Sequence, residues 1–320
     1  MITLSKLAKL ANVSISTASK AFSGSREVNA QTRAEIFSVA KELGVFKKFY
    51  NVKYPRLVVA VIVPEFHSRN YGPLLSEIQR VLEDRGCSMT VTPAGFLPFE
   101  NNKIYDYYSK YTDVDGIIVI GEYDHSGDEL DIPCVVIGSE NLCGNICGIR
   151  ITSRAATFDA ISYLKASGAV SVGFISEPKT LTKLSYFTDA MTKIYGTVDE
   201  KYVIVTKNRF EEGGYEGMKK LIEAGNLPRA VLCGYDNMAY GAVRCLKDFG
   251  FRVPQDVAVI GYDDNAESEY IFPSLSSINV KHKECAVAAA DTLMKIILTQ
   301  PHSRVITINA EFKPRESSKI

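Results

Sequence analysis

Short hydroxyl side chains and a lysine gather in residues 14–20, which read SISTASK. Ser14 is a good helix N-cap, and a helix that begins after it turns Phe22 toward a core. The same helix turns Ile15, Ser16 and Lys20 outward. Such side chains on an exposed helix can hydrogen bond to base edges in the major groove of DNA, and a lysine can reach a guanine or a phosphate. The segment therefore predicts a DNA-reading helix.

Two neighbouring helices are needed to position this one. Thr3 can cap a helix with Leu7 on its apolar face, and Asn12 supplies a tight turn into the second helix. Asn29 can cap a third helix, which Gly44 closes. Two short helices joined by a tight turn form a helix-turn-helix, and three such helices can bury one small core.

Charge is divided unevenly along the chain, although its formal net charge is zero. Up to Arg56 there are ten basic and three acidic residues, a net charge of +7, and the remainder carries −7. This division predicts an anionic polymer as the partner of the first part alone. The chain of 320 residues is 46% hydrophobic but has no apolar run long enough for a membrane span and no secretion signal. We therefore expect a cytoplasmic globular protein with no membrane partner.

From Leu57 onward, runs of valine and isoleucine alternate with amphipathic helical stretches. The strands expected from these runs lie at 57–63, 88–92, 116–120, 134–138, 171–176, 202–206, 230–233 and 257–261. Continuous apolar strands are typical of parallel sheets covered by helices on both faces, and the two series predict two α/β lobes. Ligands of such sheets bind beyond the carboxyl ends of the strands, so we expect a cleft between the lobes.

Aromatic, acidic and hydroxyl side chains follow several of these strands. Carboxylates form paired hydrogen bonds with hydroxyl groups, and aromatic faces cover the C–H patches of a sugar, so this chemistry predicts a hydroxyl-rich ligand. The residues concerned include Phe66, Ser68, Tyr71, Tyr235, Asp236 and Asp263.

The sequence carries no pattern typical of catalysis or of a bound cofactor. It has no dinucleotide-binding turn, phosphate loop or serine nucleophile turn, and its four histidines are far apart. The seven cysteines read as buried free thiols. Cys143 and Cys147 are close in sequence but have no second ligand pair near them, so we favour a loop without metal. We expect a protein that is not an enzyme and has no metal or cofactor.

Residues 3–44, TLSKLAKLANVSISTASKAFSGSREVNAQTRAEIFSVAKELG, resemble the DNA-binding headpiece of the lactose/galactose repressor family along their whole length. The resemblance implies that Ile15, Ser16 and Lys20 read bases. It also implies a set of residues that contact phosphates or cap helices, namely Thr3, Ser14, Thr17, Ser19 and Asn29.

The connector at 47–56 departs from this family. Family members carry a Tyr-x-Pro-Asn stretch and a hinge helix with a leucine that inserts into the minor groove, whereas this segment is shorter and has no leucine before Leu57. Its basic and aromatic residues, with Lys47 and Lys48 among them, can lie along phosphates or insert an aromatic wedge. Alternatively, the aromatics pack on a neighbouring domain and the segment is a linker.

The remainder resembles the sugar-binding core of the same family, most densely at AVLCGYDNMAYGAVRCLKDFGFRVPQDVAVIGYDDNAESEYIFPSLSSINV. By this resemblance, Asp263 matches the sugar-binding aspartate, and Tyr71 falls where an aromatic residue often lines the cleft. The fold implied is similar to that of periplasmic sugar-binding proteins.

Three positions depart from the family pattern in this core. Lys183 replaces a frequent effector-binding arginine, Tyr235 replaces the usual asparagine before Asp236, and Arg209, beside Phe210, stands where a stacking aromatic is common. Lys183 and Arg209 together suggest an acidic or phosphorylated sugar, because a cation pair left without partners in a closed cleft is unfavourable. Alternatively, both long side chains extend to solvent.

The sequence thus predicts an α/β protein with a three-helix helix-turn-helix domain at 1–46, a short connector at 47–56, and a two-lobed periplasmic-binding-protein-like domain for ligand binding and dimerisation at 57–320. We expect a transcriptional regulator, a repressor of carbohydrate-utilisation genes, controlled by a small carbohydrate-like effector. Its expected partners are near-palindromic double-stranded operator DNA and a second copy of the chain, with a tetramer as an alternative. The other functional hypothesis is a cytoplasmic carbohydrate-binding protein with degenerate DNA binding.

Overall fold

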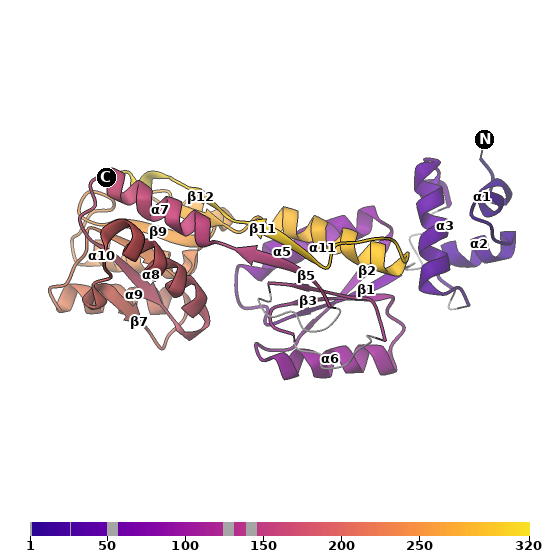
Figure 1. The fold of residues 1–320 in the computed structure, drawn as a ribbon, viewed down its shortest axis with the longest axis horizontal. Coiled ribbons are helices and arrows are strands. Elements are labelled where there is room, and N and C mark those ends of the chain that lie inside the picture. The colour runs from indigo at the N-terminus through magenta and orange to yellow at the C-terminus, as the bar shows by residue number, and fades with distance from the viewer. Residues whose placement is uncertain (1, 26, 50–56, 124–130, 139–145) are drawn as a thin grey trace. The chain divides into compact units, whose positions relative to one another are not determined.

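A computed structural model describes residues 2–25, 27–49, 57–123, 131–138 and 146–320 (Figure 1). The N-terminal helices are α1 (Leu4–Leu10), α2 (Ile15–Phe22), α3 (Ala30–Glu42) and the short α4 (Phe46–Phe49). We call residues 2–49 the helical domain. The chain divides into two compact units, one that contains the helical domain with residues 57–150 and 282–307, and one formed by residues 151–281 and 308–320. We call the sheet-containing parts of these units the first lobe and the second lobe.

The three expected N-caps are confirmed. The side chain of Thr3 accepts a hydrogen bond from the backbone N–H of Lys6, that of Ser14 accepts from Thr17, and that of Asn29 accepts from Thr32. Each cap satisfies a backbone donor that has no partner within its helix. The apolar faces then meet in one small core, whose buried members include Leu7, Ala18, Phe22, Ile36 and Phe37.

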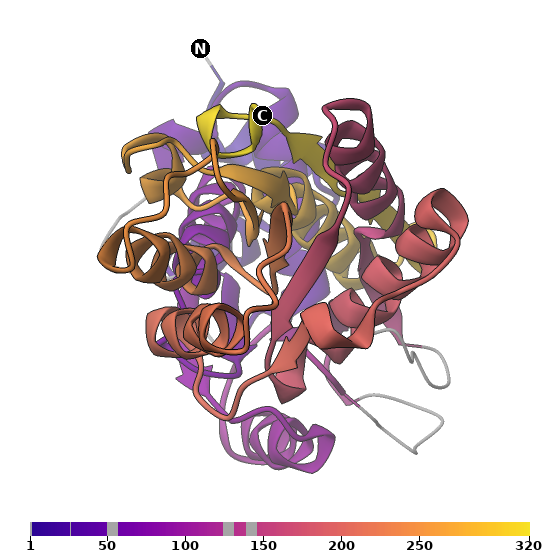
Figure 2. The same ribbon diagram turned by 90° about the vertical axis from the view of Figure 1, so that its left-hand side faces the viewer.

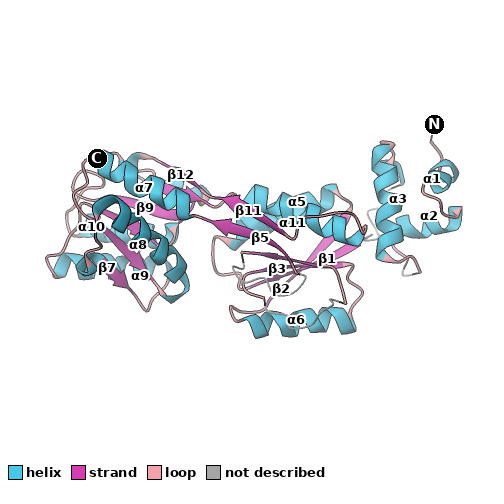
Figure 3. Cartoon of the chain, in the orientation of Figure 1, coloured by secondary structure: helices cyan, strands magenta, loops and turns pink. Residues whose placement is uncertain are grey.

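The first lobe is a sheet with the strand order β11-β5-β4-β3-β1-β2. Its strands are β1 (Leu57–Val63), β2 (Cys87–Pro93), β3 (Gly116–Ile120), β4 (Cys134–Ile137), β5 (Cys147–Thr152) and β11 (Val305–Asn309). Strands β1 to β5 pair in parallel. Helices α5 (Tyr71–Asp84) and α11 (His282–Ile297) cover one face and α6 (Pro98–Tyr111) covers the other, as Figure 3 shows.

The second lobe is a sheet with the strand order β12-β10-β9-β8-β6-β7. Its strands are β6 (Val172–Ser176), β7 (Val203–Val205), β8 (Ala230–Cys233), β9 (Ala258–Asp263), β10 (Ser276–Asn279) and β12 (Glu311–Lys313). Its helices are α7 (Arg154–Ala166), α8 (Leu181–Tyr195), α9 (Phe210–Glu223) and α10 (Asp236–Asp248), with short 3-10 turns at η1 (Pro178–Thr180), η2 (Glu200–Tyr202), η3 (Ala266–Glu269) and η4 (Glu316–Ser318).

Alternate residues of the second-lobe strands enter two separate cores. Phe174 and Leu232 pack with residues of α7 and α8, whereas their neighbours Ile175 and Val231 pack with residues of α9 and α10. Figure 2 shows these helix pairs on opposite faces of the sheet. Because both faces are covered, both alternating sets must be apolar, which explains the continuous valine and isoleucine runs.

The expected α/β class and the expected strands are confirmed, with ends that shift by one or two residues. Strands β5, β10, β11 and β12 are not among those expected from the sequence. Residues 276–279 of β10 are SSIN, which has no apolar run, and β12 pairs with β10 in an antiparallel direction that the alternation of strands and helices does not predict. None of the described helices is long and apolar enough to cross a membrane.

Candidate functional site

The exposed face of α2 presents the residues expected to read DNA. The side chains of Ser16 and Ser19 are exposed and Ile15 is 53% exposed, while Ala18 and Phe22 on the opposite face are buried. The helix begins immediately after its Ser14 cap and is only eight residues long. A short, rigidly capped helix with small polar side chains on its outer face has the dimensions and chemistry that a major groove accepts.

Several predicted DNA-contacting residues already have partners within the helical domain. The hydroxyl groups of Ser14 and Thr17 lie 2.8 Å apart, and Lys20 forms an ion pair with Glu27. Lys48 donates a hydrogen bond to the backbone oxygen of Ile2 over 2.7 Å. The side chain of Lys47 lies outside the described part of the chain.

The two aromatic residues of α4, Phe46 and Phe49, pack against rings of the helical domain. The rings of Phe46 and Phe37 have centroids 5.3 Å apart, and Phe49 lies 5.7 Å from Phe22. The side chains of Phe46 and Phe49 are half-buried. For these two residues the structure favours packing over insertion into DNA, whereas Tyr50 and Tyr54 lie outside the described residues.

Three predicted or neighbouring side chains meet at the carboxyl ends of the second-lobe strands. The ammonium group of Lys183, on α8, lies 3.1 Å from Oδ1 of Asp263 at the end of β9 and donates to the backbone oxygen of Gly234 over 2.8 Å. It also lies 4.6 Å from the centre of the Tyr262 ring. The Asp263 side chain is only 6% exposed and that of Lys183 is 24% exposed, so this ion pair is largely shielded from water. We call these groups, with the network below, the second-lobe site.

Glu177, which sequence reasoning missed, joins Tyr235 and Arg209 in one network. The Tyr235 hydroxyl donates to Oε1 of Glu177 over 2.9 Å, and Nε of Arg209 lies 3.7 Å from the same oxygen. Burial and the nearby Glu177 carboxylate raise the pKa of the Tyr235 hydroxyl, which therefore stays a hydrogen-bond donor. The sequence did contain a signal for Glu177, because this acid immediately follows the strand at 172–176.

Asp236 lies among hydrogen-bond donors of its own lobe. Its carboxylate is fully buried: Oδ1 accepts from the Ser277 hydroxyl over 2.6 Å, and Oδ2 accepts from Asn265 N and the Ser268 hydroxyl over 2.7 and 2.8 Å. Burial, followed by repulsion from Asp263, raises the pKa of Asp236 to about 7. Through these hydrogen bonds Asp236 holds the segment after β9 in place, and its predicted contact with a ligand stays a prediction.

The remaining predicted ligand residues lie on separate segments. In the first lobe Phe66 is 61% exposed, Ser68 accepts a hydrogen bond from Asn70 N, and Tyr71 begins α5 with a half-buried side chain. In the second lobe, Phe210 begins α9, and its ring lies 5.6 Å from that of Tyr235 and 4.4 Å from the Arg209 guanidinium. The expected cleft between the lobes stays a prediction.

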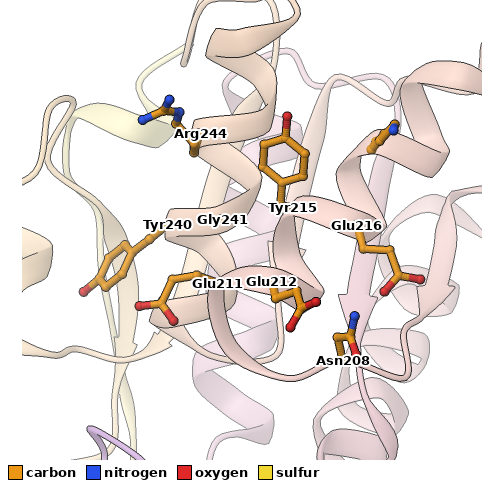
Figure 4. A pocket seen from close by; sticks show the side chains of 9 residues that line it. Asn208, Glu211, Glu212, Tyr215, Glu216, Tyr240, Gly241 and Arg244 are labelled. Atoms are coloured by element: carbon orange, nitrogen blue, oxygen red, sulfur yellow. The ribbon is translucent and has the colours of Figure 1, made fainter.

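A cavity of about 630 Å³ lies elsewhere in the second lobe, between α9 and α10 (Figure 4). Tyr215, Glu211 and Glu212 from α9 face Tyr240 and Arg244 from α10 there. None of the predicted ligand residues lines this cavity. Within the described residues, no group of histidine, cysteine, aspartate and glutamate side chains is arranged to hold a metal ion.

Comparison with protein families matches both parts of this architecture. Residues 3–45 match the model described as "Bacterial regulatory proteins, lacI family", and residues 161–318 match the "Periplasmic binding protein-like domain". The chain is therefore a DNA-binding transcription regulator of the lacI family, with a periplasmic-binding-protein-like sensor domain.

Individual relatives extend over the full chain. It is 27% identical to the "Probable HTH-type transcriptional repressor ExuR" of Bacillus subtilis, with 99% of this chain and 98% of that protein covered. It is 28% identical to the "HTH-type transcriptional regulator GalR" of Streptococcus thermophilus, with both chains fully covered. The solved "transcriptional regulator CelR-cellobiose complex" has the same fold, with a TM-score of 0.71, 24% identity, and coverage of 99% of this chain and 100% of that one. That the relatives are regulators confirms the expectation that this chain is not an enzyme.

Proposed function

We propose that this chain is a cytoplasmic repressor of carbohydrate-utilisation genes that binds a near-palindromic operator as a homodimer and responds to a small carbohydrate-like effector. The observation that carries the DNA-binding part is the exposed face of α2, where Ile15, Ser16 and Ser19 stand clear of the helical core. A single helical domain makes few contacts with DNA, and a two-fold-symmetric pair doubles them. We therefore expect a dimer to bind a symmetric site.

The second-lobe site supports a ligand with several hydroxyl groups. In the described contacts, Asp263 uses Oδ1 for Lys183, so Oδ2 can accept a hydrogen bond from a hydroxyl group, and the Lys183 ammonium has further donor capacity. The rings of Tyr235 and Phe210 stand close to the same end of the sheet and can cover the apolar C–H groups of a sugar ring. Phe66, Ser68 and Tyr71 are the first-lobe residues proposed to contact the same ligand.

Charge pairing in this site favours a neutral ligand over the acidic one suggested by the sequence. Lys183 is paired with Asp263, and Arg209 faces Glu177, so each cation has a carboxylate partner within its own lobe. A neutral polyhydroxylated ligand leaves both pairs intact, whereas an anion competes with the two buried carboxylates for the same cations.

The test is selection of bound duplexes from a random DNA library by the purified full-length chain at near-physiological salt. We expect a two-fold-symmetric motif whose affinity falls steeply with salt concentration, because lysine contacts to phosphates release counterions. The Ser16→Ala variant is expected to relax the preference at one base position of each half-site with an unchanged salt slope. A matched control, Ser38→Ala on the far helix α3, leaves the selected motif unchanged. Weak binding without any sequence preference would instead support a carbohydrate-binding protein with degenerate DNA binding.

A further inference from the structure

The helical domain is attached to the first lobe by a buried ion pair. Nη1 of Arg33, on α3, lies 3.4 Å from both carboxylate oxygens of Asp115, and the two side chains are only 9% and 10% exposed. Nη2 of Arg33 donates to the backbone oxygens of Ser25 and Val28 over 2.9 and 2.7 Å. The guanidinium group is therefore fixed by the loop between α2 and α3 at the same time as it contacts the lobe.

Asp115 is likewise fixed by a backbone group of the first lobe. It immediately precedes β3, and its Oδ2 accepts a hydrogen bond from the backbone N–H of Val58 on β1 over 2.7 Å. Each partner of the ion pair is thus anchored by backbone groups of its own domain, which fixes the orientation of one domain on the other. Two surface side chains paired in solvent would not do so.

Further contacts flank the ion pair along α3 and α4. A Cβ atom added to Gly86, which has a φ of +76° in the turn after α5, would lie 2.2 Å from the ring of Phe46, so this ring rests directly on the turn. Gln31 donates to the hydroxyl of Thr299 over 3.4 Å. We call this set of contacts the docking face.

The docking face is separate from the DNA-reading face. Ile15, Ser16 and Ser19 on α2 remain exposed while α3 and α4 contact the first lobe. A docked helical domain can therefore still enter a major groove, and its orientation in that groove is set by the first lobe.

We propose that Arg33 and Asp115 are positioning residues that dock the helical domain directly on the first lobe, so that the sensor orients the reading helix through this contact. The proposal rests on the proposed DNA-binding function, but the docking itself can be measured without DNA.

Time-resolved fluorescence anisotropy tests the docking. The chain has no tryptophan, and Leu10 on α1 is 54% exposed, so Leu10→Trp places a single reporter on the helical domain. We expect this variant to tumble with the correlation time of the whole protein. Adding Asp115→Asn, which keeps an oxygen for Val58 N but removes the charge, is expected to introduce a second, several-fold shorter correlation time. Arg33→Lys, which removes the guanidinium group that contacts both carboxylate oxygens of Asp115, is expected to introduce the same short correlation time. A short correlation time already present without these changes, or none in either variant, overturns the proposal.

Asp106→Asn is the matched control, because Asp106 is an exposed aspartate of the same lobe whose ion pair is with Lys110 on its own helix, α6. It is expected to leave the anisotropy decay unchanged, and thermal unfolding of each variant checks that the first lobe remains folded. On the selected operator, Asp115→Asn is expected to weaken affinity about tenfold, because the helical domain loses its fixed orientation. The salt slope is expected to stay unchanged, because no contact with a phosphate is removed. A change in anisotropy without any change in operator affinity would overturn the positioning role, whereas absence of operator binding by the unmodified chain would overturn the proposed function alone.

Discussion

Paired charges dominate the second-lobe site at the scale of single residues. There are two ion pairs here, Lys183 with Asp263 and Arg209 with Glu177, and the carboxylate of each is almost entirely buried. Removal of one partner leaves an unpaired buried charge, which strongly destabilises the folded protein. Substitution of any of these residues is therefore expected to affect stability as well as ligand binding. Asp236 differs from these carboxylates because it has no cation as a partner in the described contacts. It accepts three hydrogen bonds, from the backbone N–H of Asn265 and the hydroxyl groups of Ser268 and Ser277.

Asp263→Asn tests the ligand-binding part at this scale. The substitution keeps the shape of the side chain but removes the charge that a sugar hydroxyl and Lys183 both use, so affinity for a neutral effector is expected to fall roughly 10- to 100-fold. Isothermal calorimetry on the full chain measures this for the sugars that bind the unmodified protein. Asp189→Asn, which alters an exposed ion pair with Arg154 in the same lobe, is the control, and equal affinity in all three proteins would contradict the assignment of Asp263.

Lys41 on α3 gives the docking region a pH dependence. Burial lowers the pKa of its amine to about 8; among the smaller effects from the first lobe, Cys87 and Asp84 raise this pKa and Arg85 lowers it further. Below about pH 8 the amine is charged in both the folded and the unfolded chain. Between about pH 8 and its usual value of 10.5 only the unfolded chain keeps the proton, so this residue makes the free energy of unfolding rise with pH in that range.

Lys41→Met is expected to remove that rise and to stabilise the chain at pH 7, because an apolar side chain carries no desolvation cost. Urea unfolding of both proteins between pH 7 and 10 measures the difference. The control Lys6→Met, at an exposed position on α1, should keep the pH slope of the unmodified chain. Parallel pH profiles for Lys41→Met and the unmodified chain would show that the amine is not desolvated.

At the scale of elements, two glycines allow α9 and α10 to cross closely in the second lobe. A Cβ atom at Gly214 of α9 would lie 1.7 Å from the backbone oxygen of Met238 on α10, and one at Gly241 of α10 would lie 1.9 Å from the oxygen of Glu211. Backbone atoms cannot move aside as side chains do. The position of Arg209 at the start of α9, and of Tyr235 at the start of α10, therefore depends on this crossing.

Gly214→Ala is accordingly expected to destabilise the chain by about 1–3 kcal/mol or more, since the two helices must separate to admit the methyl group. Thermal or urea unfolding measures the loss. Gly72→Ala on α5 is the matched control, because no atom lies within 4 Å of its added Cβ, and it is expected to be neutral or to stabilise by about 0.4–1 kcal/mol. A neutral effect of Gly214→Ala would mean that the helices cross less tightly than described.

At the scale of the whole molecule, the basic helical domain and the acidic lobes divide the two binding tasks. The N-terminal part up to Arg56 carries a charge of +7 and the remainder −7, so DNA is attracted to the first and repelled by the second. The second lobe has its own sheet and two cores, and its candidate ligand residues lie on its own strands and helices. Ligand binding is therefore expected to need no contact from the helical domain.

Deletion of residues 1–56 tests this division. The shortened chain is expected to lose salt-dependent DNA binding and to keep its affinity for the effector within about twofold, because no proposed ligand residue is removed. Electrophoretic mobility shift and calorimetry measure the two properties separately. Effector affinity that disappears with the helical domain would show that the two tasks are not separable in this chain.

Local signals in the sequence determined the helix-turn-helix and most of the strands. The caps Thr3, Ser14 and Asn29, the helical periodicity and the valine and isoleucine runs each act over a few residues, and the structure confirms them. Lys183 and Asp263 are each predicted as ligand-binding residues from their family positions, and this role stays a prediction.

Only the tertiary structure decided which distant groups are partners. Arg33 and Asp115 are 82 residues apart, and Glu177 and Tyr235 are 58 apart, so no local pattern relates them. The burial of Asp236 behind its three donors likewise depends on how β9, β10 and α10 pack. Such contacts are set by the packing of separate elements, because a side chain's partners depend on which elements meet and not on its neighbours along the chain.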